Sequence, residues 1–304
     1  MTDNPASLEA TFETHRERLL GLAYRMLGSR ADAEDIVQET WLRVSSSTSI
    51  SSSSSTSAST SRIDNLQAYL LTVATRLCLD QLKSARRKRE QYVGTWLPEP
   101  VIAAETPSPA EETELADDLS FALLLTLEKL TPPERAAFLL HDVFALSFKD
   151  VAMTLGKSEA ACRQLATRAR RAVQKSKPQQ AVPAETHRTL LSQFSRATET
   201  GDLEGLKRLL HDEAVLYSDG GGVKLAALNP VYGADKIARF FLGVAGKVEP
   251  DSVNVVARTI NCHPGLLIYV DGELDLTVGI DCYDNRIVAI YLVRNPEKLQ
   301  IIGQ

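Results

Sequence analysis

The stretch SFKDVAMTLGKSEAACRQLATRARRAVQKSK, residues 147–177, has the pattern of two short helices joined by a tight turn. Ser147 and Ser158 are residues that cap helix N-termini, and Gly156 suits a helix C-terminus, where a left-handed backbone is common. Between the first serine and the glycine, apolar residues recur at helical spacing: Phe148, Val151, Ala152 and Leu155. This arrangement predicts a helix-turn-helix, a unit that places its second helix in the major groove of DNA.

The second helix of this unit is strongly basic on its outer surface. Its expected inward stripe is Ala161, Cys162, Leu165, Ala169 and Ala172. Arginine binds guanine edges and phosphates through two hydrogen bonds, and a helix N-terminus suits a phosphate. The alternative is a solvated charged face, which the turn and the concentrated charge disfavour. The candidate DNA-binding residues are Lys157, Ser158, Arg163, Gln164, Thr167, Arg168, Arg170, Arg171 and Lys175.

Charge is distributed unevenly along the chain. The formal net charge is −5, which by itself argues against a nucleic-acid binder. Residues 157–184 nevertheless carry +6, whereas residues 93–120 carry −7 and residues 185–304 carry −4. A concentrated positive segment is the electrostatic footprint of DNA binding, so we give the local charge more weight than the net charge.

The bulk composition is that of an ordinary soluble protein, with 304 residues, 44% hydrophobic and 24% charged, enough for two or three domains. No run of about 18 apolar residues is present, so no membrane span is expected, and the N-terminus lacks the pattern of a secretory signal. Four cysteines are scattered without metal-ligand spacing, so we expect buried thiols in a reducing cytoplasm and neither a metal nor another cofactor: Cys78, Cys162, Cys262 and Cys282.

The N-terminal part of the chain has the pattern of a helical bundle. Residues 8–44 predict two helices separated at Gly28-Ser29, and a third helix is expected from Asn65 to about Arg89. Between them, Ser45–Ser61 contains almost no apolar residue and cannot bury enough surface to offset its conformational entropy. We therefore expect a mobile loop there.

Two charged surfaces lie on these helices. Asp32, Asp35 and Glu39 share one face, with Glu34 and Gln38 beside them, while Ile36 and Trp41 lie on the other side. Alone, such an acidic face is most often merely solvated. The third helix ends in five bases within seven residues, more than helix capping needs, which favours contact with phosphates: Lys83, Arg86, Arg87, Lys88 and Arg89.

Residues 93–120 carry seven acids and no base and predict an acidic linker. Within it, Trp96–Pro100 (WLPEP) is an apolar island that we expect to be extended, because proline disfavours helix at the residue before it. Thr131 and Glu134 then form a capping box that opens a helix, which gives residues 121–177 the pattern of a three-helix unit.

From about Pro183 the pattern becomes that of an α+β domain. One helix is expected across residues 190–209 and a second across Ala234–Leu242, and Asp271-Gly272 is a strong hairpin signal. A curved sheet with helices packed on one side would accommodate these elements. The expected strands are Ala214–Tyr217, Val253–Ile260, Leu266–Val270, Glu273–Asp281 and Ile287–Val293.

Paired aspartate and histidine residues in this domain would suggest catalysis. His211-Asp212 is expected to cap the end of a helix and His263 to lie in a turn. Ordinary surface positions are expected for three further carboxylates: Asp219, Asp275 and Asp281. We therefore predict no catalytic residue, with an enzymatic C-terminal domain as the alternative.

Three segments carry a resemblance to a known family: ADAEDIVQETWLRV (31–44), NLQAYLLTVATRLCLDQLKSARRKRE (65–90) and LTPPERAAFLLHDVFALSFKDVAMTLGKSEAACRQLATRARRAVQ (130–174). Together they resemble extracytoplasmic-function (ECF) sigma factors, with the first two looking like sigma region 2 and the third like sigma region 4. The final domain resembles the SnoaL-like cone-shaped α+β barrel. Sigma factors with that fusion, the SigJ-like group, have three motifs that match Trp96, Leu97, Pro98, Glu99, Pro100; Asp219, Gly220, Gly221, Gly222; and Asn295, Pro296, Glu297, Lys298.

The resemblance implies a multidomain chain with two all-α sigma domains and a C-terminal α+β SnoaL-like barrel. The expected boundaries are 1–92 for the region 2 helical bundle, 93–120 for the linker, 121–177 for the region 4 helix-turn-helix and 185–304 for the SnoaL-like domain. The implied function is that of a cytoplasmic, monomeric sigma factor that directs core RNA polymerase to promoter DNA.

The resemblance also assigns roles to residues. Region 2 would bind the β′ coiled-coil of core polymerase and region 4 the β flap, and the basic helix of region 4 would read the −35 element through the nine candidate residues given above. The polymerase contacts would be Asp32, Glu34, Asp35, Gln38, Glu39 and Trp41. The −10 element would be bound by Asn65, Arg76, Lys83, Arg86, Arg87, Lys88 and Arg89.

The Ser/Thr tract departs from the family, in which this loop carries charged and aromatic residues near the −10 bases. The tract argues against direct capture of a flipped base by this loop. Two alternatives remain: the protein discriminates only weakly among −10 sequences, or the loop becomes ordered only on DNA.

We hypothesise that the acidic linker and the C-terminal domain pack against regions 2 and 4, hold their spacing and compete with DNA for the basic surfaces. Trp96 and Leu97 would anchor the linker on the C-terminal domain near Asp219–Gly222 and Asn295–Lys298; packing of the motif on region 2 only is the alternative. A helix-turn-helix regulator with a ligand-sensing domain is the alternative function, and it would not bind core polymerase. Whether the C-terminal domain binds a small molecule is left open.

Overall fold

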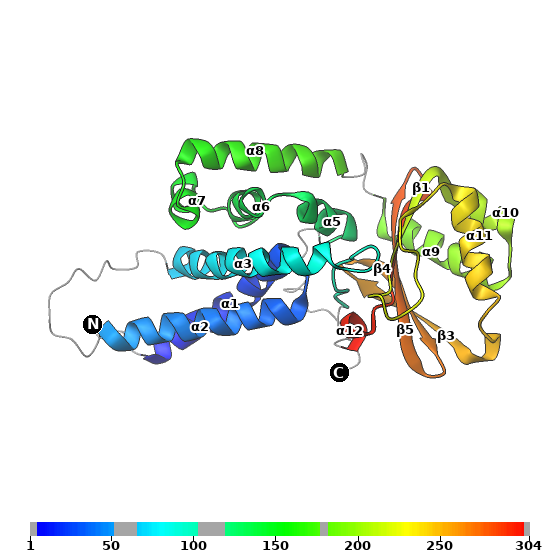
Figure 1. The fold of residues 1–304 in the computed structure, drawn as a ribbon, viewed down its shortest axis with the longest axis horizontal. Coiled ribbons are helices and arrows are strands. Elements are labelled where there is room, and N and C mark those ends of the chain that lie inside the picture. Colours follow the sequence, from blue (N-terminus) through cyan, green and yellow to red (C-terminus); the bar gives the residue numbers. More distant parts are fainter. Residues whose placement is uncertain (1–4, 52–65, 103–118, 177–181, 301–304) are drawn as a thin grey trace. The chain divides into compact units, whose positions relative to one another are not determined.

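The computed structural model describes residues 5–51, 66–102, 119–176 and 182–300 (Figure 1). Its contacts divide the chain into two compact units. The first comprises residues 1–87 and 126–175, and the second comprises residues 88–125 and 176–304. No helix among the described ranges is long and apolar enough to cross a membrane.

The first unit begins with three long helices, α1 (Pro5–Leu27), α2 (Arg30–Ser51) and α3 (Leu66–Glu90). The predicted break between the first two is present: Gly28 has a positive φ of 70°, and the Ser29 hydroxyl accepts a hydrogen bond from the Asp32 amide at 3.2 Å. The apolar stripes of α1 and α3 form the core, with the largest fully buried side chains being Leu19, Leu22, Met26, Leu27, Leu70 and Leu71.

The Ser/Thr tract is helical where the structure describes it. Helix α2 continues to Ser51, so a mobile loop beginning at Ser45 is wrong for residues 45–51. The Ser45 hydroxyl donates to the Leu42 carbonyl at 3.2 Å and the Ser46 hydroxyl to the Arg43 carbonyl at 3.0 Å. Serine hydroxyls can bond back to carbonyls of the preceding turn, so polarity alone does not end a helix. Residues 52–61 of the tract and Asn65 lie outside the described residues.

The predicted helix-turn-helix is present. Helix α7 (Phe148–Leu155) starts at Ser147, whose side chain accepts from the Asp150 amide, and ends at Gly156 with φ of 62°. Helix α8 (Glu159–Ser176) starts at Ser158, whose hydroxyl accepts from the Ala161 amide at 3.2 Å. The buried stripe of α8 is Cys162, Ala166, Ala169 and Val173, so the expected stripe was partly misplaced: Ala161, Leu165 and Ala172 are only half-buried.

Three shorter segments precede it: α5 (Phe121–Lys129), α6 (Pro132–Phe138) and the π-helical turn η1 (Leu139–Val143). The capping box at Thr131 forms as predicted, since the Thr131 amide donates to the Glu134 carboxylate at 3.1 Å. The second half of the helix that it opens widens into the π-turn, where the Phe144 amide donates to the Leu139 carbonyl at 2.9 Å.

The second unit contains a six-stranded sheet in the order β2-β1-β6-β5-β4-β3. Strands β1 and β6 are parallel and all other neighbours are antiparallel. Asp271 and Gly272, with φ of 52° and 83°, make the predicted hairpin between β4 and β5. The strands are β1 (Leu210–Asp219), β2 (Val231–Tyr232), β3 (Val253–Ile260), β4 (His263–Val270), β5 (Glu273–Tyr283) and β6 (Arg286–Val293).

Helices α9 (Ala184–Glu199), α10 (Leu203–Leu209) and α11 (Ala234–Ala245) pack on one face of this sheet and enclose its larger hydrophobic core (Figure 1). The single helix expected across residues 190–209 is therefore two. Gly201 adopts φ of 70° and the Asp202 side chain caps α10 by accepting from the Gly205 amide at 2.8 Å. A short turn η2 (Pro250–Ser252) and a final helix α12 (Pro296–Leu299) complete the unit.

Three local expectations in this unit were wrong. His211 and Asp212 lie in strand β1 and cap no helix. His263 begins β4, and the turn before it is made by Asn261 and Cys262, which have φ of 51° and 65°. Cys262 is consequently exposed, whereas the other three cysteines are buried as expected.

The buried His187 on α9 gives the second unit a pH-dependent stability. Burial, followed by the nearby His263, lowers the pKa of His187 to about 4, and a hydrogen bond to the Ile280 backbone opposes this shift. The unfolded chain binds a proton near pH 6.5, so folding becomes less favourable as pH falls from about 6.5 towards 4.

We predict that urea unfolding midpoints of the wild-type chain fall over this pH window, and that His187→Leu flattens the fall. The matched control His211→Gln, in the half-buried part of β1, should keep the wild-type slope. An unchanged slope in His187→Leu would show that another group carries the effect.

Candidate functional site

The inter-region linker forms part of a second hydrophobic core on the opposite face of the C-terminal sheet. Leu97 is fully buried there and Phe121 is 4% exposed. They pack with Leu267, Tyr291 and Val293 of the sheet and with Leu299 of α12, and the Phe121 and Tyr291 rings stack with centroids 5.0 Å apart. Burial of the Leu97 and Phe121 side chains contributes about 1.5–3 kcal/mol each to the stability of the folded unit. The chain is thus packed against the C-terminal sheet both before and after residues 103–118, which lie outside the described residues.

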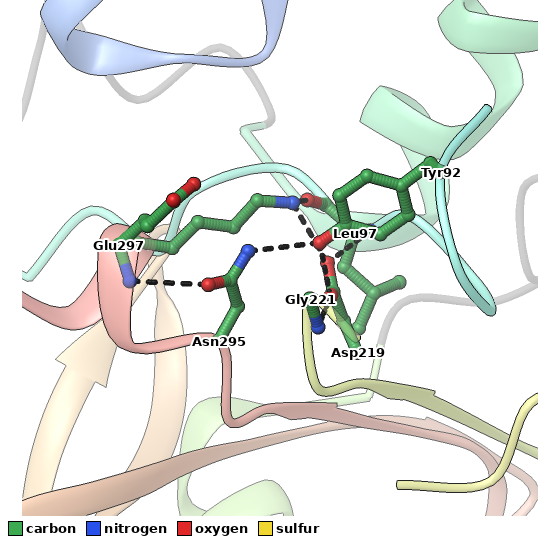
Figure 2. A network of polar contacts seen from close by, with 7 residues as sticks. Tyr92, Leu97, Asp219, Gly221, Asn295 and Glu297 are labelled. Carbon is green, nitrogen blue, oxygen red and sulfur yellow. Dashed lines mark hydrogen bonds and ion pairs between the residues drawn. The ribbon is translucent and has the colours of Figure 1, made fainter. Parts of the chain in front are cut away.

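A buried carboxylate organises the polar contacts beside this core (Figure 2). Asp219, 1% exposed, accepts hydrogen bonds from the Leu97 amide at 2.8 Å, the Tyr92 hydroxyl at 2.5 Å and the Gly221 amide at 3.0 Å. Its fourth partner is the Lys298 ammonium at 2.7 Å. One side chain therefore joins the chain before the WLPEP motif, the motif itself, the DGGG turn and the C-terminal helix α12.

Lys298 is the positive counterpart. Its ammonium also donates to the Leu97 carbonyl and lies 4.4 Å from the centre of the Trp96 ring. Burial lowers the pKa of Lys298, while the charge of Asp219 opposes that shift. Burial also raises the pKa of Tyr92, and its hydrogen bond to Asp219 adds to the rise. The network thus holds one neutral phenol and one compensated ion pair.

Asn295 and two glycines complete the arrangement. The Asn295 amide nitrogen donates to the Tyr92 hydroxyl at 2.9 Å, and its oxygen caps α12 by accepting from the Glu297 amide at 3.0 Å. Gly221 has φ of 65°, and a Cβ there would lie 2.5 Å from the Asn295 side chain. The glycine is required both for its backbone conformation and for this close approach.

Asn261 holds the linker at a second place, which could not be singled out from sequence alone. Its side-chain oxygen accepts from the Val101 amide at 3.0 Å, and its side-chain nitrogen donates to the Leu119 carbonyl at 3.0 Å. The neighbouring Ile260 pairs with Ile102 as an antiparallel bridge. The positive φ of Asn261, in the turn after β3, is what turns this side chain to the linker. A lone asparagine near the end of a predicted strand is the only signal that the sequence carries.

In the first unit, the predicted polymerase-binding residues lie on α2 beside a hollow of about 310 Å³ between α1 and α2. Trp41 lines this hollow and packs on Phe12 with ring centroids 5.0 Å apart. Leu42, which sequence reasoning missed, also lines it and is 59% exposed. The acidic face is partly neutralised, because Arg30 pairs with Glu34 at 3.1 Å and Arg43 with Glu39 at 2.8 Å; Asp32, Asp35 and Gln38 lie on the same helix.

The predicted −10 residues lie on α3 and are not all available on its surface. Lys83 pairs with Asp80 at 2.7 Å, and Arg76 donates to two backbone carbonyls of α7. Arg89 lies over the Trp96 ring, with its guanidinium carbon 4.0 Å from the ring centre. Helix α3 also contains Arg86, Arg87 and Lys88, whose side chains are not among those that the structure describes.

The predicted −35 residues line the outer surface of α8 and the turn before it. Lys157, Ser158, Gln164, Thr167, Arg171 and Lys175 are exposed. Three arginines already have carboxylate partners within the first unit: Arg163 pairs with Glu159 at 2.7 Å, Arg168 with Glu134 at 3.8 Å and Arg170 with Asp142 at 2.5 Å. The arginine side chains of these pairs are 37–68% exposed, so each ion pair contributes little to stability.

The carboxylates expected on the surface of the C-terminal domain are instead buried or engaged. Asp219 is the centre of the network in Figure 2, and Asp275, with a side chain 9% exposed, pairs with Lys224 and Arg294. Asp281 accepts from the Tyr291 hydroxyl at 2.6 Å. The pattern alone could not distinguish a surface carboxylate from one with a buried cationic partner far away in sequence. A groove of about 1080 Å³ lies elsewhere in this unit, between α9 and strands β3 and β4.

Both helical regions of the chain match families of known proteins. Residues 11–88 match the Sigma-70 region 2 family and residues 120–173 match the Sigma-70, region 4 family. The two all-α domains therefore define a sigma-70-type transcription initiation protein with a fused α+β domain.

The chain is 38% identical over 300 residues to the ECF RNA polymerase sigma factor SigJ of Mycobacterium tuberculosis, covering 94% of this chain and 91% of the relative. It is 32% identical to the probable ECF RNA polymerase sigma factor SigI of the same species, covering 96% and 94%. The crystal structure of M. tuberculosis SigJ matches with a TM-score of 0.74 and 36% identity over 96% of this chain and 98% of that one. This chain belongs to the ECF RNA polymerase sigma factors, which direct core RNA polymerase to promoters.

The network predicts a large stability cost for losing its central carboxylate. Asp219→Ala would leave the buried Lys298 charge without its counter-ion and three hydrogen-bond donors without their acceptor, so we expect a loss of about 3–5 kcal/mol in the unfolding free energy of the second unit. Denaturant titration with Trp96 fluorescence in a Trp41→Phe background measures it, since these are the two tryptophans. The control Asp235→Ala removes an exposed ion pair with Arg239 and should change stability little. Equal effects of both substitutions would refute the central role of Asp219.

Proposed function

We propose that the C-terminal domain modulates this sigma factor by holding the linker between its two promoter-binding regions. The observation that carries the proposal is the anchoring of the linker at Leu97 and, directly after its end, at Phe121 in one core, reinforced by Asp219 and Asn261. A linker held at both ends restricts the distances that the two regions can adopt. For two linked binding sites, such restriction sets the effective concentration of the second site once the first is bound.

Electrostatics supports the same proposal. The linker carries −7 and residues 185–304 carry −4, whereas residues 157–184 carry +6. An acidic domain tethered to a basic DNA-binding helix lowers the attraction of the whole chain for unspecific DNA. Specific promoters, which add base contacts, are then favoured over unspecific sites.

In the first unit, we propose that α2 and the hollow beside it bind the β′ coiled-coil of core polymerase and that region 4 binds the β flap. The exposed Leu42 and the half-buried Trp41 would supply apolar contact, Gln38 lines the same hollow, and Asp32 and Asp35 would add polar contacts from the same helix. Helix α3 would bind the −10 element through Arg76, Lys83 and the basic run to Arg89. Helix α8 would read the −35 element, with bases contacted mainly from its N-terminal half.

We propose a regulatory and not an enzymatic role for the C-terminal domain. Each carboxylate considered for catalysis has a structural partner: Lys298 for Asp219, Arg294 for Asp275 and Tyr291 for Asp281. Carboxylates held by such partners stabilise the fold and are poorly placed to shuttle protons. The chain would act as a monomer in the cytoplasm, where its polymerase partner works.

Truncation tests the modulation directly. We predict that a chain ending after residue 177 and full-length Asp219→Ala change promoter-directed run-off transcription with core polymerase in the same direction, because both release the linker. The Asp235→Ala chain is the matched control with wild-type output. Wild-type output from the truncated chain, or opposite effects of the two changes, would contradict the proposal.

Helix α8 offers a separate test of −35 recognition. Gln164→Ala and Arg168→Ala should relax base preference at one position each and cost about 1–3 kcal/mol on the preferred promoter. Lys175→Ala, near the end of the helix, should weaken binding to all sequences alike and reduce the slope of log K against log salt by about 1. Binding titrations of full-length chain on a promoter library separate these results; uniform weakening by all three variants would argue against base reading by α8.

A further inference from the structure

The groove of about 1080 Å³ between α9 and strands β3 and β4, here called the α9–β3 groove, lies at the margin of the larger hydrophobic core. Helix α9 packs on β4, and β3 beyond it is an edge strand of the sheet. The helix therefore leaves part of β3 uncovered: Val255 is 43% exposed and Ala257 is also exposed. The volume is at the upper end of that of small-molecule sites, about 300–1,000 Å³, and far exceeds what an inorganic ion needs.

One face of α9 forms a polar wall of the groove. The lining residues recur at the spacing of a single helix face: Arg188, Ser192, Ser195, Arg196 and Glu199. The neighbouring Thr189 and Thr198 donate back to carbonyls of the preceding turn at 3.0 Å and 2.9 Å. Within the described residues, the hydroxyls of Ser192 and Ser195 make no such hydrogen bond. These two hydroxyls can therefore donate to a ligand.

Strand β3 forms the apolar floor. Val255, Ala257 and Thr259 alternate along the strand, so they share the face that is turned to α9. Leu191 and Leu266, both buried members of the larger core, also line the groove. A ligand in the groove would therefore meet apolar carbon below and polar groups along the α9 side.

The groove concentrates positive charge in an acidic domain. Its lining contains three arginines and one acid: Arg188, Arg196, Arg258 and Glu199. That is a net +2, whereas residues 185–304 as a whole carry −4, so the rest of the domain carries −6. Arg188 pairs with the exposed Glu185 at 3.3 Å, a weak contact, and Arg196 has no carboxylate partner among the described residues. Guanidinium groups bind planar acid groups through two parallel hydrogen bonds.

We propose that the α9–β3 groove binds a small organic anion. The arginines and the hydroxyls of α9 hold its acid group, and its apolar body covers the exposed carbon of β3. Few convergent polar groups over an apolar lining is the general organisation of small-molecule sites. An inorganic anion would leave the β3 floor in water, and a neutral apolar molecule would leave Arg196 without a counter-ion, so both parts of the ligand are needed.

This site goes beyond the proposed control by the linker and does not depend on it. Binding is measured on the free full-length chain without polymerase or promoter, so its failure leaves the regulatory proposal untouched. Failure of the truncation experiment likewise leaves the groove untouched.

The probe is 8-anilinonaphthalene-1-sulfonate, an aromatic sulfonate whose fluorescence reports apolar surroundings. We expect saturable binding to the full-length chain, weakened about three- to tenfold by Arg196→Gln, because the substitution removes a cationic partner of the sulfonate. Arg239→Gln removes an equally exposed arginine on α11, outside the groove, and is the matched control with wild-type affinity.

A blocking variant assigns the probe to the groove. Ala257→Trp places an indole over the floor at an exposed position, so we expect it to abolish this binding while the urea unfolding midpoint stays at the wild-type value. Octanoate should displace the probe, and 1-octanol, with the same apolar chain and no charge, should do so about tenfold less well.

Three outcomes would overturn the proposal. The first is equal probe affinity of the wild type, Arg196→Gln and Arg239→Gln, and the second is unchanged binding in a folded Ala257→Trp chain. The third is probe binding that appears only after the six acids of residues 103–118 are replaced by their amides, which would assign the groove to the chain's own linker.

Discussion

The buried ion pair between Asp219 and Lys298 is the interaction on which the arrangement of the second unit depends. Removing two charges from water is costly, and their attraction offsets that cost only when the remaining lone pairs and protons are also satisfied. Here the carboxylate has three further donors, and the ammonium has a carbonyl and an aromatic ring. Because the donors come from the linker and from the DGGG turn, the pair is satisfied only when the linker is in place.

The sheet of the C-terminal domain consequently has two hydrophobic faces with different covers. Three helices of the domain itself cover one face, as expected for an α+β fold. The other face is covered in part by Leu97 of the linker and by Phe121, which directly follows the linker and begins α5. The domain therefore cannot complete its second core without the segment that joins region 2 to region 4. This coupling is the physical basis of our proposal that the domain modulates promoter use.

Much of the fold could be predicted because its signals are local. The caps at Ser147 and Ser158, the end at Gly156 and the hairpin at Asp271-Gly272 each depend on a few adjacent residues, and all are present. The predicted helix boundaries were wrong where the structural preference of one residue type conflicts with the pattern of its neighbours. The Ser45 and Ser46 hydroxyls donate to helix carbonyls and α2 continues through them, and Gly201 divides a helix whose apolar spacing looks continuous.

The partners of the site residues were harder to predict, because they are distant in sequence. Motif resemblance pointed to Trp96–Pro100, Asp219–Gly222 and Asn295–Lys298, and the structure brings the three segments together. Motif resemblance could not indicate that Arg76 would donate to α7 or that Asn261 would hold both ends of the linker. Such contacts follow from tertiary packing, which periodicity and composition do not encode.

Amide hydrogen exchange of the full-length chain at the linker tests the central claim most directly. The Leu97 and Val101 amides donate to the side chains of Asp219 and Asn261. If the linker is part of the C-terminal core, these two amides will exchange as slowly as those of the central strand β6. Exchange at the rate of an unstructured chain would show that the linker is free and that the C-terminal domain does not hold the two sigma regions through it.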